Sequence, residues 1–165
     1  MEITPPFSLD SNHLKFLGPD RAVEFFRRLL WAEASRVGIG GNLIQVPGCI
    51  NVGDGGIDAY IENADPLFVD VIPKGTTGYQ IKSSDLRPSE CVKELHEQGE
   101  SDAPLKPELK RILDNRGNYV LVLFEDLTVP KKQRRLHAIQ DELSRLGYNN
   151  KVRIYTIDQL IGFTE

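Results

Sequence analysis

Cysteine, histidine and long apolar runs are scarce in this chain, and each absence excludes a class of protein. Only two of the 165 residues are cysteine and three are histidine. Cys49 and Cys91 lie far apart and belong to no CxxC or Cys/His cluster, which argues against a zinc site and a disulfide framework. His13, His96 and His137 lack metal-ligand spacing, so we interpret them as incidental. No apolar run could cross a membrane, and no signal-peptide pattern opens the sequence. We expect a cytoplasmic protein with reduced thiols and no membrane contact.

The charge balance limits how the chain could bind nucleic acid. Its formal net charge is −4 at pH 7. Any surface for a polyanion must therefore be a local patch on an otherwise acidic protein. The length favours one domain, spanning residues 1–165, with enough chain to bury a core.

Apolar periodicity predicts an α/β fold, a mixed central sheet flanked by helices. The run Tyr119–Phe124 is unbroken and apolar, as in a central buried strand. With the helix and strand that follow, it suggests a βαβ crossover. Strands are expected at 43–46, 56–62, 67–72, 79–82, 119–124 and 151–157, and helices at 21–37, 88–98, 107–114 and 130–146. We expect no helix after the last strand.

The most informative feature is a pair of short polar motifs, one on each of two neighbouring strands. The first is Gly53-Asp54-Gly55-Gly56-Ile57-Asp58, and the second is Tyr79-Gln80-Ile81-Lys82-Ser83-Ser84. Alternation along a strand places Asp58 on the face opposite the apolar odd-numbered positions, and it places Gln80 beside Lys82. If the strands pair, a carboxylate, a carboxamide and an ammonium group converge on one face of the sheet.

These three groups suit metal-assisted hydrolysis of a phosphodiester. Mg²⁺ or Mn²⁺ prefers oxygen ligands, and one or two carboxylates with a carbonyl are enough. Asp58 would be the principal ligand, with the Gln80 side-chain oxygen and the Ile81 carbonyl completing or orienting the coordination. Lys82 would position the attacking water and stabilise charge in the transition state.

The motifs resemble the active-site signature of the restriction-endonuclease-like (PD-(D/E)xK) superfamily. The sequence Gln80-Ile81-Lys82 is similar to that of the Mrr-type branch, in which glutamine commonly replaces the second acid. The segment 72–78 resembles nuclease domains at the N-termini of bacterial antiphage proteins. The resemblance covers roughly residues 20–85, with a compatible α/β tail beyond. It implies a restriction-endonuclease-like core and a nuclease effector followed in the same chain by C-terminal regulatory domains.

A further acid is expected from the first long helix. Asp20 is the predicted N-cap, and the apolar stripe of the helix surrounds Glu33. A carboxylate directed into a core needs a partner or a metal. Glu33 is therefore nominated as a direct or water-mediated metal ligand, and the alternative is an ion pair with a residue such as Arg36. Glu24, which points away from the stripe, is the fallback acid.

The helix expected at 130–146 begins with four basic residues: Lys131, Lys132, Arg134 and Arg135. Positive charge at a helix N-terminus opposes the helix dipole unless an anion offsets it. These residues could contact a nucleic-acid backbone, or they could form a solvated basic face, which is the more common situation.

The sequence thus predicts a metal-dependent endonuclease that acts on double-stranded DNA, with catalytic residues Glu33, Asp58, Gln80 and Lys82. Oligomerisation or other domains could supply affinity for the substrate. Two alternatives stay open: a nuclease that cleaves RNA, and a non-catalytic nuclease-like module for interaction or oligomerisation.

Overall fold

A five-stranded mixed sheet forms the centre of the molecule. The structure is a computed structural model that describes residues 9–45 and 56–164. Along the sheet the strands follow their order in the chain, from β1 to β5. The pairs β1–β2 and β2–β3 are antiparallel, whereas β3–β4 and β4–β5 are parallel. The strands are β1 (Ile44–Gln45), β2 (Ala59–Ala64), β3 (Gly75–Lys82), β4 (Asn118–Leu123) and β5 (Val152–Tyr155).

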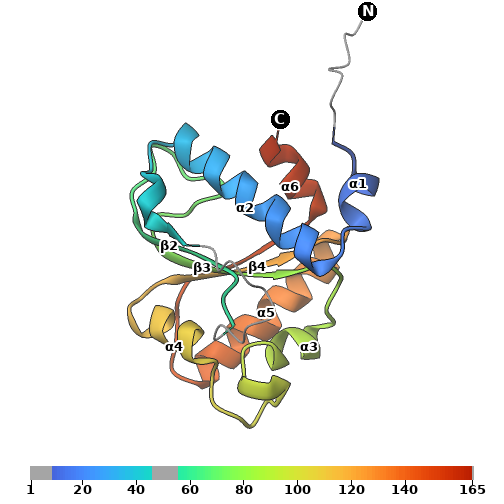
Figure 1. Ribbon diagram of the computed structural model, residues 1–165. Helices are drawn as coiled ribbons and strands as arrows, with labels where there is room; N and C mark the ends of the chain where they lie inside the picture. The colour runs from blue at the N-terminus through green and yellow to red at the C-terminus, as the bar shows by residue number, and fades with distance from the viewer. Residues whose placement is uncertain (1–8, 46–55, 165) are drawn as a thin grey trace, which may run out of the picture.

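Helices cover both faces of the sheet, which gives three layers (Figure 1). One face carries α1 (Ser11–Lys15), α2 (Pro19–Arg36) and α6 (Ile157–Thr164), and the other carries α3 (Pro88–Lys93), α4 (Pro107–Asp114) and α5 (Val129–Arg145). The described residues also form two 3-10 turns, η1 (Gly41–Leu43) and η2 (Glu97–Gly99). The prediction of an α/β chain with a mixed sheet between helices is confirmed.

Strand β4 separates two apolar cores, as its unbroken apolar sequence predicted. All six of its residues are buried. Val120 and Val122 pack into the core beneath α2, whereas Leu121 and Leu123 pack into the core against α4 and α5. Alternation in a strand that is covered on both faces explains why no polar position interrupts the run. The predicted β4–α5–β5 crossover is present, since β4 and β5 are parallel.

Helix α2 forms because its buried positions recur every three or four residues. Ala22, Phe26 and Leu30 are completely buried, as the periodicity predicted. The predicted start was wrong, because the N-cap is Gly18 and Asp20 lies inside the first turn. Proline at position 19 explains this start, since proline suits the first helical position, where its missing N–H costs nothing.

The strand expected at 67–72 is absent, and bends occupy these residues. Leu67, Phe68 and Val69 are exposed, while Val71 and Ile72 are completely buried. Both edges of β2 are already paired, with β1 and β3, so no edge remains there for a further strand. The loop is held instead by its backbone, because the hydroxyls of two buried tyrosines donate to one of its carbonyls. These bonds join Tyr79 and Tyr155 to the oxygen of Val71.

The helix expected at 88–98 is shorter than predicted, since α3 ends at Lys93. The next residues use their backbone groups elsewhere: Lys106 N–H donates to Leu95 O, and Glu97 N–H donates to Pro104 O. A bridge of this kind removes the bonds that would continue a helix. The expectation that no helix follows the last strand was also wrong, because residues 157–164 form α6.

Part of the first polar motif, Gly53-Asp54-Gly55, lies outside the described residues, as does Cys49. Cys91 is completely buried, and burial raises the pKa of its thiol to about 12. The expectation of a reduced thiol agrees with this environment, because a protonated buried thiol reacts slowly. In the part of the chain that the structure describes, no helix is both long and apolar enough to cross a membrane.

Two glycines test the packing of this fold with the same substitution. A Cβ on Gly117 would lie 2.8 Å from the Ile112 carbonyl oxygen, whereas a Cβ on Gly162 would meet nothing within 4 Å. We expect Gly117→Ala to lower the free energy of unfolding by about 1–3 kcal/mol, because the clash involves backbone. Gly162→Ala, within α6, should raise it by about 0.5–1 kcal/mol. Urea denaturation measures both, and equal effects would contradict the packing described.

Candidate functional site

Asp58 lies directly before β2, and its carboxylate is held against the next strand. Its N–H donates to the carbonyl of Tyr79 at 2.8 Å. Its Oδ2 accepts a hydrogen bond from the N–H of Ile81 at 2.6 Å. The carboxylate thus lies beside the backbone of the Gln80–Lys82 segment, and the strands that carry or follow the two motifs are paired.

Gln80 is a buried polar side chain whose amide is bonded at both ends. The hydroxyl of Tyr119 donates to Gln80 Oε1 at 2.5 Å, and Gln80 Nε2 donates to Glu94 Oε2 at 2.9 Å. Burial, together with nearby negative charges that include Glu94 and Asp58, raises the pKa of Tyr119 well above its ordinary value. Tyr119 is therefore a neutral hydroxyl that can donate to Gln80 Oε1. The carboxylate of Glu94 can only accept, and this fixes the Nε2 end of the amide toward Glu94.

Lys82 lies beside Gln80 and contacts the same acid. Its Nζ is 2.9 Å from Glu94 Oε2, and the Nζ of Lys106 is 3.3 Å from the same oxygen. The side chain of Lys82 is 32% exposed and that of Glu94 is 26% exposed, so water reaches the pair. Three nitrogen donors converge on Glu94 Oε2, and none of these three bonds goes to Oε1.

The charge of Glu94 is stabilised by its cationic partners. Burial acts to raise the pKa of the carboxyl, but the hydrogen bond and positive charge of Lys82, with those of Lys106, outweigh it and lower the pKa below its ordinary value. An ionised carboxylate, a neutral amide and two ammonium groups therefore share one partly exposed site. We call Asp58, Gln80, Lys82 and Glu94 the β3 cluster.

The sequence reasoning missed Glu94, Tyr119 and Lys106. Glu94 is the C-cap of the short helix α3, and the predicted long helix gave no reason to direct it at β3. Lys106 reaches the site because its aliphatic stem lies against Gly56, where a Cβ would come within 2.3 Å of it. Tyr119 was recognised only as part of an apolar strand. One signal was available, since a buried glutamine needs partners for both ends of its amide.

Ile57 departs from the predicted alternation of the first motif. It packs in the core against α4, whereas the other apolar odd-numbered positions, Ala59 and Ile61, pack in the core on the opposite face of the sheet. The reason is that β2 begins only at Ala59, so strand alternation does not apply to Ile57.

Glu33 does not meet the β3 cluster. It is buried, but α2 covers the opposite face of the sheet from α3 (Figure 1). Arg36 donates two hydrogen bonds to the Glu33 carboxylate, at 2.8 and 2.7 Å, and also contacts Asp70 at 3.1 Å. The arrangement is the ion pair that the sequence left open as the alternative. Glu24 also lies on α2, where it bonds to Arg28 and Arg27, so neither helix acid joins the site.

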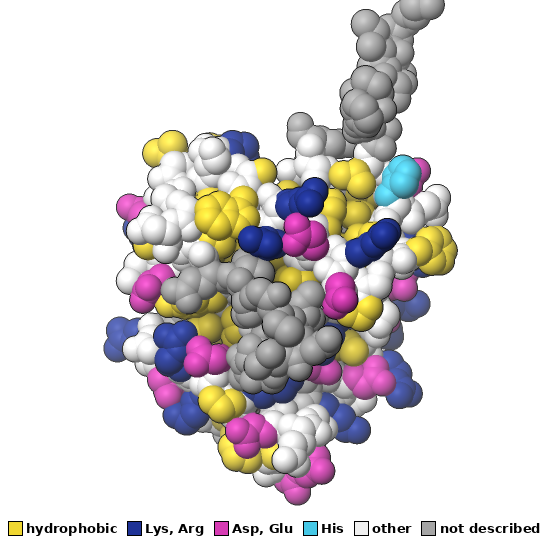
Figure 2. Space-filling view, in the orientation of Figure 1, with side chains coloured by type: hydrophobic (Ala, Val, Ile, Leu, Met, Phe, Trp, Pro, Cys, Tyr) yellow, Lys and Arg dark blue, Asp and Glu magenta, His cyan; other side chains and the backbone are white. Residues whose placement is uncertain are grey.

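The four basic residues at the start of α5 do not form one patch. Arg135 is buried, where it donates to the Asp85 carboxylate at 2.7 and 3.0 Å. Lys132 donates to Gln159, and burial lowers its pKa. Lys131 and Arg134 stay exposed. Charges of both signs also mix over the face that Figure 2 shows. The predicted nucleic-acid contact is thus reduced to two exposed residues.

His96 is not incidental, contrary to the expectation from its spacing in the sequence. Its side chain is buried, and its ring nitrogens lie 2.6 Å from Ala103 O and 2.9 Å from Glu142 Oε1. Arg145 and His96 lower the pKa of Glu142, although partial burial acts to raise it. This network ties the chain after α3 to α5 through the buried ring of His96, so we assign His96 a structural role.

The described residues contain no group of three or more histidine, cysteine or acidic side chains that could hold a metal ion. The β3 cluster supplies two carboxylates, Asp58 and Glu94, and both lie close enough to Tyr119 to raise its pKa. Two carboxylates with carbonyl oxygens suit Mg²⁺ or Mn²⁺, which keep several waters, and do not suit zinc. The donors present therefore fit the predicted metal, provided that Glu94 takes the place expected for Glu33.

Comparison of the chain with protein-family models, curated proteins and solved structures found no match.

The ion pairs of Glu94 predict a pH-dependent contribution to stability. Because the folded pKa lies below the ordinary value of 4.5, the contribution is fully present above that value and is lost as the pH falls through the folded pKa. At about pH 7 we expect Glu94→Gln to lower the free energy of unfolding by about 1–3 kcal/mol, because three donors lose a charged acceptor. The difference should shrink steadily below pH 4.5.

Chemical denaturation at several pH values measures this difference. Glu100→Gln is the matched control, since that side chain is exposed and should give no difference at any pH. A Glu94→Gln deficit that persists unchanged in acid would show that the carboxylate charge is not what stabilises the site.

Proposed function

We propose that the chain is a metal-dependent endonuclease domain with a restriction-endonuclease-like core, acting on double-stranded DNA. The observation that carries the proposal is the contact of Lys82 with the Glu94 carboxylate, at a strand whose backbone also bonds the carboxylate of Asp58. Lys82 Nζ lies 2.9 Å from Glu94 Oε2, while Asp58 is bonded to the same strand one residue earlier, at Ile81. This set of groups is the one that the resemblance to the PD-(D/E)xK superfamily implies, with a different second acid.

Each residue of the β3 cluster would have a separate task. Asp58 and Glu94 would hold the divalent cation, and the Ile81 carbonyl could add an oxygen. Gln80 would keep Glu94 in place, because its buried amide is fixed by Tyr119. When bound, the cation would supply Lewis-acid activation of the phosphodiester and of the attacking water.

Lys82 would supply positive charge at the reacting phosphate. Its Nζ now neutralises Glu94, and once that carboxylate binds a cation the ammonium group can turn to a phosphate oxygen. Partial exposure of both side chains leaves room for this exchange. A lysine that donates hydrogen bonds to a phosphate stabilises the charge that grows in the transition state.

The biological setting follows from the resemblance alone. We infer an effector role in antiphage defence in the cytoplasm, as the N-terminal part of a longer chain whose C-terminal domains control activity. Oligomerisation could supply the affinity that an acidic domain lacks. RNA is the alternative substrate, because the proposed roles of the cluster involve the phosphodiester group and none involves the sugar.

One observation favours a non-catalytic nuclease-like module instead. Every member of the β3 cluster already has a partner within the protein, and Glu94 Oε2 accepts from three nitrogens. A network whose donors and acceptors all bond to one another is compatible with a purely structural role, here the joining of α3 to β3. Interaction or oligomerisation would then be the function of the domain.

Plasmid nicking with Mg²⁺ or Mn²⁺ separates these proposals. We expect wild type to nick supercoiled DNA, and we expect Asp58→Asn, Lys82→Ala and Glu94→Gln each to reduce the rate at least about 100-fold, since each loses a metal ligand or a transition-state charge. An RNA substrate in parallel tests the alternative nucleic acid.

Two control variants sharpen the assay. Glu33→Gln should nick at close to the wild-type rate, because Glu33 belongs to the Arg36 ion pair on the other face of the sheet. Lys93→Ala removes an exposed lysine next to Glu94 and should also nick normally. Loss of nicking in a folded Glu33→Gln variant with retention in Glu94→Gln would refute our choice of acid. No nicking of either substrate by wild type would favour the non-catalytic module.

A further inference from the structure

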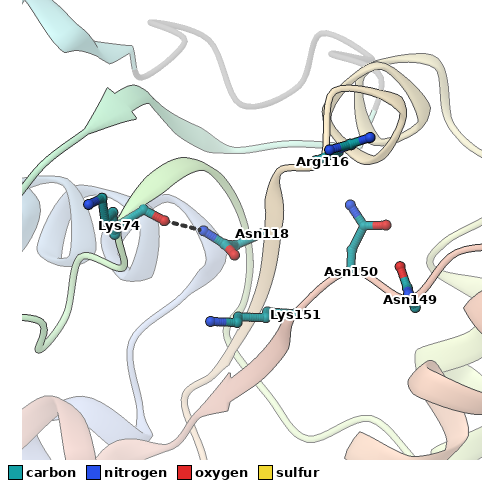
Figure 3. A pocket seen from close by; sticks show the side chains of 6 residues that line it. All are labelled: Lys74, Arg116, Asn118, Asn149, Asn150 and Lys151. Carbon is teal, nitrogen blue, oxygen red and sulfur yellow. Dashed lines mark hydrogen bonds between the residues drawn. The ribbon is translucent and has the colours of Figure 1, made fainter.

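A polar pocket lies at the opposite end of the parallel strands from the β3 cluster. Its cavity volume is about 610 Å³, in the range of small-molecule sites. The chain before β3, β4 and β5 forms it, because parallel strands bring these ends to one edge (Figure 3). The eight residues of β3 separate this edge from Lys82 by about 25 Å. The lining residues are Lys74, Arg116, Asn118, Asn149, Asn150 and Lys151.

The lining carries three cations and three carboxamides, and none of these six residues is acidic. Among the described residues, Arg116 and Lys151 form no ion pair, although the whole chain is net negative. Lys74 lies 3.6 Å from Asp65, but both side chains are largely exposed, so the pair is weak. Three exposed cations therefore line the hollow with little compensation by acids, which favours an anion as the ligand.

Arg116 occupies a backbone conformation that suits glycine. Its φ is +60°, directly after the C-cap of α4, and glycine follows at position 117. A side chain in this conformation costs free energy relative to glycine. The strained position nevertheless carries a guanidinium group at the rim of the pocket, and a planar guanidinium binds phosphate oxygens in pairs.

Two of the carboxamides present acceptors to a ligand. Asn118 Nδ2 donates to Lys74 O and Thr77 Oγ1, and Asn150 Nδ2 donates to Leu113 O and Gly117 O. With both nitrogens used in holding the loops, the side-chain oxygens accept no hydrogen bond within the described part of the chain. They suit hydroxyl or amino groups, which a bare phosphate ion lacks.

We propose that this pocket binds a phosphorylated small molecule with hydroxyl or amino donors, such as a nucleotide. The cations Lys74, Arg116 and Lys151 hold the phosphate groups, and the carboxamide oxygens accept from the sugar or base. The site is independent of the nuclease proposal, since it shares no residue with the β3 cluster and requires no cleavage.

Calorimetric titration with ATP, in the absence of divalent cations, tests the site in the whole chain. We expect wild type to bind ATP. Lys151→Ala and Arg116→Gly should each raise the dissociation constant for ATP about tenfold or more, because each removes a charged partner of phosphate. Arg116→Gly suits the positive φ, so the protein should stay folded. Lys93→Ala, an exposed lysine elsewhere, is the matched control and should bind ATP as wild type does.

Two further ligands identify the source of the phosphate. Tripolyphosphate, which has no hydroxyl or amino donors, should bind more weakly than ATP. A short DNA duplex should not compete with ATP. Three outcomes would each overturn the proposal. ATP could fail to bind at millimolar concentration, or it could bind equally well to both pocket variants. Alternatively, binding of the duplex, and not of ATP, could depend on Lys151 and Arg116.

Discussion

The buried amide of Gln80 is the interaction on which the arrangement of the site depends. One end accepts from the hydroxyl of Tyr119 on β4, and the other donates to Glu94 after α3. The Glu94 carboxylate can only accept, so Gln80 directs its Nε2 toward Glu94 and its oxygen toward the neutral hydroxyl of Tyr119. The amide therefore joins the parallel β3–β4 pair to the helical layer and holds an ionised carboxylate beside Lys82. Reversal of the amide would set its oxygen against Glu94, which is unfavourable in a buried site.

Charged side chains around this network form separate groups on the two faces of the sheet and at the ends of its parallel strands. Glu33 and Arg36 satisfy each other beneath α2, so the inward carboxylate on that side has its compensation locally. On the other face, Lys82 and Lys106 both converge on Glu94. At the far edge of the sheet the pocket before β4 carries cations without acids. The lysines at the β3 cluster are thus balanced by carboxylates, whereas the lining of the pocket at the other end of the parallel strands holds cations and no acid.

Local patterns in the sequence predicted the elements whose partners lie close in the chain. Periodicity predicted the apolar stripe on α2, the buried run of β4 and the β4–α5–β5 crossover. It also predicted that Gln80 and Lys82 lie on the same face of their strand. Glu94 could not be predicted, because α3 stops where the chain pairs residues 95–97 with 104–106, a contact that no local pattern encodes. Glu33 was correctly predicted to be buried, but phase along a helix does not tell which face of the sheet the helix covers. The burial of Arg135 and His96 was not predicted either, because their partners Asp85 and Glu142 lie about 50 residues away in the chain.

The central claim is that Asp58 and Glu94 together form a site for a divalent cation beside Lys82. Titration of the whole chain with Mn²⁺, followed by calorimetry, tests it without requiring substrate or turnover. Our account predicts binding that is lost in Asp58→Asn and strongly weakened in Glu94→Gln, and that is unchanged in Glu33→Gln. Binding that survives both substitutions in the cluster, or that disappears only when Glu33 is replaced, would contradict it.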